Sequence, residues 1–138
     1  VESKLLRLKP RCPGKYNVSI FAKNIKSSKE YDSMESFSVY VHEVMPVSGT
    51  KVLLSSDEIK VGRDITFEVK SQGGKDVCYE FYMMNKGNWV KVQEYSKKKY
   101  YSFIPFISGK YKILVLSKSF YKKVNYEDYD IIEFSVEE

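Results

Sequence analysis

A turn that runs into a strand decides the fold of this chain, and it reads Ser108-Gly109-Lys110-Tyr111-Lys112-Ile113-Leu114-Val115-Leu116-Ser117-Lys118. An earlier stretch in the same register reads Pro13-Gly14-Lys15-Tyr16-Asn17-Val18-Ser19-Ile20-Phe21-Ala22-Lys23. The offset between them is 95 positions, the difference between 109 and 14, and it also aligns Pro10 with Pro105. Self-similarity at one fixed spacing is typical of repeat proteins. The sequence therefore predicts a tandem array in which the first copy is only a C-terminal half.

The length of the repeat sets the expected domain boundaries. A chain of 138 residues has room for one and a half copies of this period, and the period matches an immunoglobulin-sized sandwich of about 100 residues. Val44 to Gly49 holds a Pro and a Gly, which is typical of a linker. We therefore expect half a repeat at 1–43, a linker at 44–49 and a complete repeat at 50–138.

Composition and alternation both favour β-strands. The chain has 12 Tyr and 8 Phe, residue types that suit a pleated, half-buried surface. Apolar and polar residues alternate at 16–23 and 37–42, the period of a strand with one buried face. We expect three strands in the first copy, the earliest at 4–8, and seven in the second, near 52–54, 65–69, 77–83, 89–93, 100–103, 110–117 and 131–136. With turn signals about every ten residues, this predicts an all-β, immunoglobulin/fibronectin-III-like antiparallel β-sandwich.

A Gly-x-Tyr motif opens the repeated strand in both copies. Such a motif before a penultimate strand is typical of a tyrosine corner, in which the phenol packs inward and its hydroxyl bonds an upstream backbone group. We therefore interpret Tyr16 and Tyr111 as structural, and we expect Gly14 and Gly109 to adopt positive φ. Glu80 should lie on the wetter face of its strand.

The motifs together resemble a known family. The segments Tyr79-Glu80-Phe81-Tyr82, Asn88-Trp89-Val90, Phe103 and Gly109-Lys110-Tyr111 resemble the three-Y (triple-tyrosine) domain of the "two component regulator three Y" family. The first copy keeps Gly14-Lys15-Tyr16 and Phe37-Ser38-Val39. The segments Tyr31-Asp32 and Tyr129-Asp130 resemble the tail of tandem clostridial versions. Two departures are that Tyr100-Tyr101 precedes Phe103, and that the second copy carries about two extra residues between Lys118 and Phe134.

The resemblance carries expectations about setting. It implies a fibronectin- or immunoglobulin-like sandwich without catalytic residues. Such domains lie beside the propellers of extracytoplasmic two-component sensors, and they form tandem modules in secreted or wall-associated clostridial proteins, some joined to amidases. The resemblance thus implies a bacterial, extracellular or cell-wall location, with neighbouring repeats of the same protein as partners.

Residue types needed for catalysis, metal binding or membrane insertion are sparse. His42 is the single histidine, and no Gly-x-Ser-x-Gly or phosphate loop occurs, so we expect neither an enzyme nor a cofactor. The carboxylates of Glu127-Asp128-Tyr129-Asp130 suit calcium, but without a spaced ligand loop we favour an acidic solvated loop and no metal site. Cys12 and Cys78 fall at different points of the repeat, which favours two free thiols. No apolar run is long enough to span a membrane.

Charge is the feature that points to partners. The formal net charge is +5. Lysines without acids occupy the stretch between Tyr95 and Tyr126, and acids without bases fill 127–138. One interpretation is a basic patch for an anionic cell-wall polymer, such as teichoic acid, or a glycan; nucleic acid is not expected. Its candidate residues are Lys97, Lys98, Lys99, Lys122 and Lys123, with Tyr82, Tyr101 and Tyr121 as exposed aromatic platforms. The alternative is that Lys110 and Lys112 pair across strands with Glu133 and Glu137 and the remainder is solvated.

The half repeat should expose an apolar face made of Tyr16, Val18, Ile20, Phe37, Val39 and Val41. Exposed faces and strand edges invite pairing with other chains. We expect this face to be covered by the complete domain, or by strand exchange or edge pairing in a homodimer. Three functions remain open: a spacer and interaction module, a polymer- or glycan-binding module, and the extracytoplasmic signal-transmitting domain of a two-component sensor.

Overall fold

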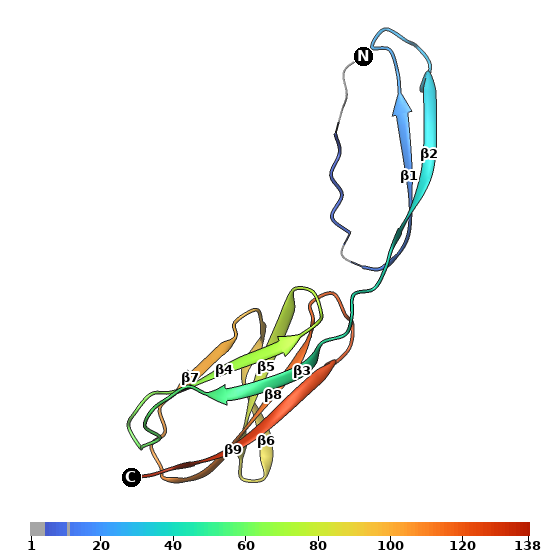
Figure 1. Ribbon diagram of the computed structural model, residues 1–138. Helices are drawn as coiled ribbons and strands as arrows, with labels where there is room; N and C mark the ends of the chain where they lie inside the picture. The colour runs from blue at the N-terminus through green and yellow to red at the C-terminus, as the bar shows by residue number, and fades with distance from the viewer. Residues whose placement is uncertain (1–4, 11) are drawn as a thin grey trace. The chain divides into compact units, whose positions relative to one another are not determined.

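The computed structural model describes residues 5–10 and 12–138. The chain divides into two compact units, Val1–Glu43 and Val44–Glu138, each with its own set of contacts. In the described residues every regular element is a strand (Figure 1). No helix in this part of the chain has the length and apolar character needed to cross a membrane.

The second unit is a two-layer antiparallel sandwich. One layer is a three-stranded sheet in the order β3-β4-β7, and the other is a four-stranded sheet in the order β6-β5-β8-β9 (Figure 1). The bounds are β3 Ser48–Leu54, β4 Ile65–Gln72, β5 Val77–Asn85, β6 Asn88–Ser96, β7 Tyr100–Phe103, β8 Gly109–Ser119 and β9 Asp128–Val136. The seven predicted strands are all present. This strand order confirms the predicted immunoglobulin/fibronectin-III-like fold.

Alternation along the strands builds the core between the two sheets. In β4 the residues Ile65, Phe67 and Val69 are buried, whereas their neighbours are at least partly accessible. The side chains of a strand point alternately to its two faces, so this pattern places every second residue between the layers. The core consists of Val52, Ile65, Phe67, Val69, Tyr79, Phe81, Ile113, Val115, Phe134 and Val136.

A tyrosine corner closes the crossing between the sheets, as predicted. The Tyr111 hydroxyl donates to the backbone carbonyl of Ile107 at 2.5 Å. Its ring stacks on Phe134, with centroids 5.6 Å apart. Gly109 has a φ of 137°, outside the range that side-chain-bearing residues readily adopt.

The described strands of the first unit form a single hairpin that repeats the last hairpin of the second. β1 (Gly14–Ala22) pairs with β2 (Ser33–Val41). Every pair from Gly14↔Val41 to Ala22↔Ser33 recurs at the same offset, from Gly109↔Val136 to Ser117↔Asp128. The corner recurs too, because the Tyr16 hydroxyl donates to the Cys12 carbonyl at 2.6 Å and Gly14 has a φ of 143°.

The register corrects how the two copies align after the repeated strand. The prediction of about two extra residues between Lys118 and Phe134 is wrong, because β2 and β9 keep the same offset. Tyr31-Asp32 therefore corresponds to Tyr126-Glu127, not to Tyr129-Asp130. The contacts agree: the Asn24 N–H donates to Asp32 Oδ2, and the Ser119 N–H donates to Glu127 Oε1, both at 2.7 Å.

The strand expected at 4–8 does not form over its described residues, 5–8. The offset makes these residues the counterpart of β7, which pairs with β4 alone. A strand needs a neighbour to satisfy its backbone groups, and the first unit has no counterpart of β4 among its described residues. Lys4, the first residue of that prediction, lies outside the described part of the chain.

Part of the segment expected to be a linker packs into the second unit. β3 begins at Ser48, and Val47 is buried. The Gly74 N–H donates to the Met45 carbonyl at 2.8 Å. A Cβ atom at Gly73 would lie 2.4 Å from the Pro46 carbonyl oxygen, so only glycine fits there.

Candidate functional site

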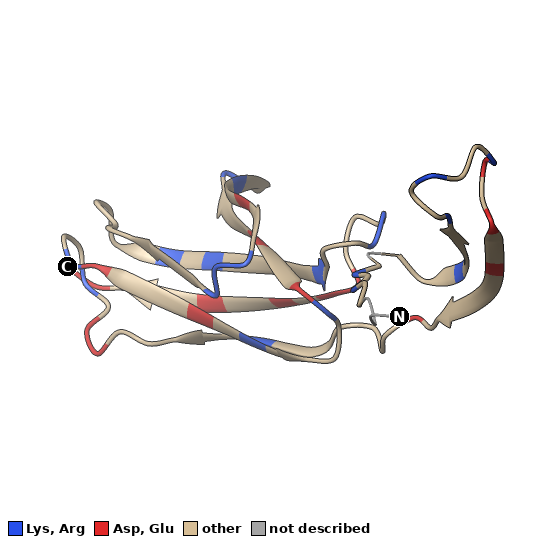
Figure 2. Cartoon of the chain, turned by 90° about the horizontal axis from the view of Figure 1, so that it is seen from above, with Lys and Arg blue, Asp and Glu red and all other residues tan. Residues whose placement is uncertain are grey.

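The lysines singled out from the sequence meet at one end of the second unit. This "basic end" is made of three loops, 73–76, 97–99 and 120–127. The pairs Val77↔Ser119 and Tyr79↔Ser96 bring the strand ends that carry these loops side by side. The lysines in these loops are Lys75, Lys97, Lys98, Lys99, Lys122 and Lys123. Figure 2 shows blue segments in these loops, at the end of the unit away from the C-terminus.

The backbone of the loop 97–99 is fixed, while its three side chains are exposed. The Lys99 carbonyl accepts from the Val69 N–H at 2.8 Å, and the Lys98 N–H donates to Ser96 Oγ at 3.2 Å. Lys97 Nζ lies 3.5 Å from Asp76 Oδ1, with both side chains more than half exposed. An ion pair this exposed contributes at most about 1 kcal/mol. The loop therefore presents positive charge on an ordered backbone.

Another lysine, Lys118, holds the longest of these loops in place. Its Nζ donates to the carbonyls of Lys122 and Val124 at 3.2 and 3.3 Å, and it lies 4.9 Å from the Tyr95 ring centroid. The Tyr95 hydroxyl donates to the Asn125 carbonyl at 2.5 Å. Lys118 is thus a structural cation. Lys123 is exposed, and Lys122 Nζ lies 5.9 Å from the Tyr121 ring centroid.

The three tyrosines expected as exposed aromatic platforms beside these lysines are partly buried. Tyr101 packs against the core and stacks on Phe81, with centroids 5.6 Å apart; burial raises the pKa of its phenol. The hydroxyl oxygen of Tyr121 is buried without a hydrogen-bond partner. The Tyr82 hydroxyl donates to Glu80 Oε1, and burial together with Glu80 raises the pKa of Tyr82 to about 12. All three are partly buried, so the prediction that they are exposed is wrong. Tyr101 packs against the core, whereas Tyr82 is partly covered on the outer face of β5.

Other aromatic residues are exposed at or beside the basic end. Phe120 and Tyr126 lie in the loop 120–127, with 63% and 49% of their surface exposed. Tyr129, at the start of β9, meets Tyr126 edge-on, with ring centroids 6.0 Å apart. Tyr100 follows Lys99 directly and is 54% exposed. The alternation of apolar and polar residues does not identify exposed aromatic residues in loops or at strand ends. Their closeness in sequence to the lysines was the signal that could have found them.

Glu80 overturns the expectation of a wet outer face on β5. Its side chain faces away from the core, yet only 7% of the residue is exposed. Lys91 Nζ lies 3.5 Å from Glu80 Oε2, and the Tyr95 N–H donates to the same oxygen at 3.3 Å. Burial, and then the charge of Glu80, raise the pKa of Tyr95. Tyrosines on neighbouring strand positions thus cover a carboxylate that would otherwise be solvated.

Trp89 lies on the same outer face as Tyr82. It pairs with Met84, two residues after Tyr82 on β5, and opposite residues of an antiparallel pair share a face. The other aromatic residues on which the family resemblance rests, Tyr79, Phe81, Phe103 and Tyr111, belong to the core or pack directly against it.

The acidic segment 127–130 forms structural contacts, so the expectation of a solvated loop is wrong. Asp128 Oδ2 accepts from the Thr50 N–H at 2.8 Å, and Asp130 Oδ2 accepts from the Val52 N–H at 2.9 Å. Burial acts to raise the pKa of Asp128, but hydrogen bonds from Thr50 and Tyr129 outweigh it and lower the pKa. The carboxylates of β9 thus satisfy backbone donors of β3, and no group of three potential metal ligands occurs among the described residues.

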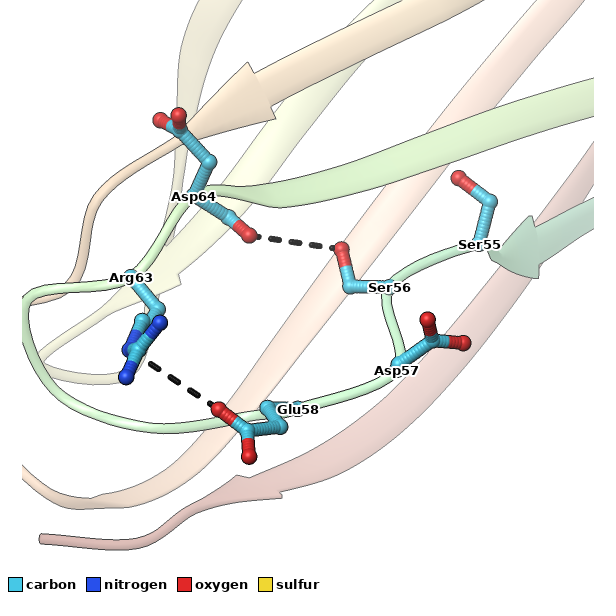
Figure 3. A pocket seen from close by; sticks show the side chains of 6 residues that line it. All are labelled: Ser55, Ser56, Asp57, Glu58, Arg63 and Asp64. Carbon is cyan, nitrogen blue, oxygen red and sulfur yellow. Dashed lines mark hydrogen bonds and ion pairs between the residues drawn. The ribbon is translucent and has the colours of Figure 1, made fainter.

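A hollow at the opposite end of the unit does not bring catalytic groups together. It is lined by Ser55, Ser56, Asp57, Glu58, Arg63 and Asp64 (Figure 3). Arg63 Nε lies 3.8 Å from Glu58 Oε2. The Ser56 hydroxyl donates to the Asp64 carbonyl at 3.4 Å and accepts from the Thr66 N–H at 2.8 Å, so it has backbone partners and no general base. His42 is exposed in the first unit. The two cysteines are free, as predicted.

Comparisons with known proteins find similarity among solved structures only at the level described below. No family model matches the chain, and no curated protein matches it. Among solved structures, domains d3–d4 of the rat CD45 extracellular region are similar, with 21% sequence identity and a TM-score of 0.45. The match covers 97% of this chain and 68% of that chain. The assignment of the fold above depends on strand order and register.

Proposed function

We propose that this chain is a non-catalytic spacer and interaction module from a tandem array of three-Y-like sandwich repeats. The observation that carries the proposal is the hairpin that recurs with the same register and the same tyrosine corner at a fixed offset. Domains joined in tandem extend a protein while each one keeps its own hydrophobic core. The secreted or wall-associated bacterial setting is supported by the resemblance to the three-Y family.

A spacer repeat should fold without help from its neighbours. We expect residues 44–138, produced alone, to unfold in one cooperative transition with the same midpoint as the second unit in the whole chain. Trp89 is the only tryptophan in the chain, so its fluorescence follows this unit in both samples. A fragment 44–138 that is unfolded, or clearly less stable than the unit in the whole chain, would contradict the proposal.

The second candidate function is binding of an anionic cell-wall polymer at the basic end. The gathering of loops 73–76, 97–99 and 120–127 favours it, because lysines distant in sequence are brought to one surface. Polyanion binding by such a surface weakens as salt screens the charges. Exposed aromatics beside the lysines, Phe120 and Tyr126, offer apolar contact area.

Co-sedimentation with Gram-positive cell walls tests this candidate. We expect pelleting at low salt that is lost when teichoic acids are stripped and that falls across a salt series. Replacing Lys97, Lys98 and Lys99 with Gln should reduce pelleting. The matched control replaces Lys15, Lys23 and Lys26 with Gln, an equal change of net charge in the first unit. An equal loss in both variants would point to net charge alone, and no pelleting at low salt would leave the spacer function.

A further inference from the structure

The inward face of the first hairpin has the same chemistry as the inward face of the last one. At each aligned position, both hairpins carry an apolar or aromatic residue. The aligned pairs are Tyr16 with Tyr111, Val18 with Ile113, Ile20 with Val115, Phe37 with Ile132, Val39 with Phe134 and Val41 with Val136. The two hairpins are therefore interchangeable in the kind of surface they offer to a partner sheet.

The burial of these two faces differs sharply. Ile20 is 53% exposed, whereas its counterpart Val115 is fully buried, and Val39 is 40% exposed against 8% for Phe134. In the second unit the inward face of β8 and β9 is covered by core residues of β3 and β4 in the facing sheet, and β5 pairs beside β8 in the same sheet. No strand covers the hairpin within the described residues of the first unit.

The apolar side chains of the segment before the hairpin are also uncovered. Leu5, Leu6 and Leu8 correspond to Tyr100, Tyr101 and Phe103 of β7, and they are 82%, 75% and 60% exposed. In the second unit Tyr101 and Phe103 stack on Phe81 and Phe67. The apolar side chains of residues 5–8 are thus suited to the same place beside a β4-like strand.

A carboxylate on the inward face of the hairpin also has a counterpart in the second unit, and that counterpart makes a hydrogen bond. Glu35 aligns with Asp130, and Asp130 Oδ2 accepts from the Val52 N–H on the outer edge of β3. A carboxylate at this place suits a strand edge that offers a free N–H. The hairpin therefore presents an apolar face together with an acceptor for a β3-like edge.

We propose that Leu5–Leu8 and the β1–β2 hairpin form a docking surface for a four-stranded half-sandwich of the β3–β6 kind. Docking would pair Leu5–Leu8 with the β4-like strand and cover the inward face of the hairpin. The observation behind it is that, within this same chain, β3 and β4 pack on the equivalent surface from the facing sheet, while β5 pairs along the edge of the equivalent strand β8 and β6 pairs with β5. The proposal does not depend on the proposed function, because it would hold for a repeat of any role.

The test places a second copy of residues 44–99 directly before Leu5 of the whole chain, because Lys99 runs into Tyr100 as this segment would run into Leu5. Hydrogen exchange is then measured with and without this extension. We expect amides in 14–22 and 33–41 to exchange at least about 100-fold more slowly in the extended chain, and amides in 5–8 to become protected. A core-matched extended chain carrying Leu6→Tyr, Leu8→Phe and Val39→Phe serves as a second measurement, in case the borrowed core fits poorly.

Two point variants of the extended chain separate docking from general effects. Ile20→Asp on the inward face should abolish the protection, and Asn17→Asp on the exposed face should retain it. If neither extended chain protects the hairpin, the proposal is wrong. It is equally wrong if the hairpin is already protected in the unextended chain, whether as a monomer or as a dimer in which a second copy supplies the cover.

Discussion

The β1–β2 hairpin and the β8–β9 hairpin have the same strand register, the same Gly-x-Tyr corner and an equivalent contact of a loop carboxylate with a backbone amide, that of Asn24 or Ser119. One has a closed core on its inner face and the other does not. The difference shows that local sequence is enough to specify pairing, register and corner. Burial, and with it most of the stabilisation, depends on the facing sheet, whose strands β3 and β4 are distant in sequence.

This comparison separates two kinds of contribution to stability. Backbone pairing and the tyrosine corner are present in both hairpins and are satisfied locally. The apolar contacts of Val115 and Phe134 exist only where a second sheet is present. Burying a side chain of this size contributes about 1.5–3 kcal/mol, so matched substitutions in the two hairpins should have very different effects.

The largest expected difference is for the central residue of each inner face. Ile113 is fully buried, so Ile113→Ala should lower the free energy of unfolding of the second unit by about 3 kcal/mol. The matched change Val18→Ala should leave it unchanged. Denaturant unfolding followed by Trp89 fluorescence measures both. Equal losses would mean that the two hairpins share one core.

The next largest effect is expected at Asp128. The aligned residue of the first hairpin is Ser33, which has no carboxylate. Asp128→Ala leaves the Thr50 N–H without its acceptor and should cost about 2 kcal/mol. Because the pKa of Asp128 is lowered in the folded state, its contribution is present above its unfolded pKa and is lost as the pH falls through the folded value. Stability measured below about pH 4 should therefore fall less steeply in Asp128→Asn than in the natural chain; parallel slopes would contradict this.

A smaller effect is expected at the tyrosine corners. Tyr111→Phe removes the hydrogen bond to the Ile107 carbonyl and should cost the second unit about 1 kcal/mol. Tyr16→Phe removes the equivalent bond to Cys12 without changing the Trp89 transition. If Tyr111→Phe left the free energy of unfolding unchanged, the prediction would be wrong, because the corner would then form without contributing to the stability of the sandwich.

The smallest effect concerns β5, a strand with no counterpart in the first unit's described residues. The pKa of Tyr82 is raised to about 12, so its contribution is complete below the unfolded phenol pKa of about 10 and is lost as the pH rises toward the folded value. Stability should fall between pH 9 and 11, and Tyr82→Phe should reduce that fall. Denaturant unfolding of the natural chain and of Tyr82→Phe at pH 9 and pH 11 checks this. An equal loss of stability in the two proteins would mean that the Tyr82 phenol is in contact with solvent.

The fold was predictable from the sequence because its signals are local. Alternation at 65–69 and the paired Gly-x-Tyr motifs predicted the strands, the corners and the repeat, and the structure agrees. The strand expected near Leu5–Leu8 fails because it needs a partner that alternation cannot reveal. Tyr101 and Glu80 were misplaced for a similar reason: whether a tyrosine is exposed, or a carboxylate covered, depends on neighbours across the sheet. The sequence showed a lysine-rich stretch without acids, but the meeting of these lysines at one end required the topology.

The carboxylates of Asp128 and Asp130 have a consequence for how such repeats coexist. They occupy the Thr50 and Val52 N–H groups on the outer edge of β3, the groups through which a foreign strand would add to the sheet. In a tandem array, near-identical strands are held at high local concentration and mispairing between neighbours is the characteristic failure. Asp128 and Asp130 therefore make these two donors of β3 unavailable to a strand of another chain.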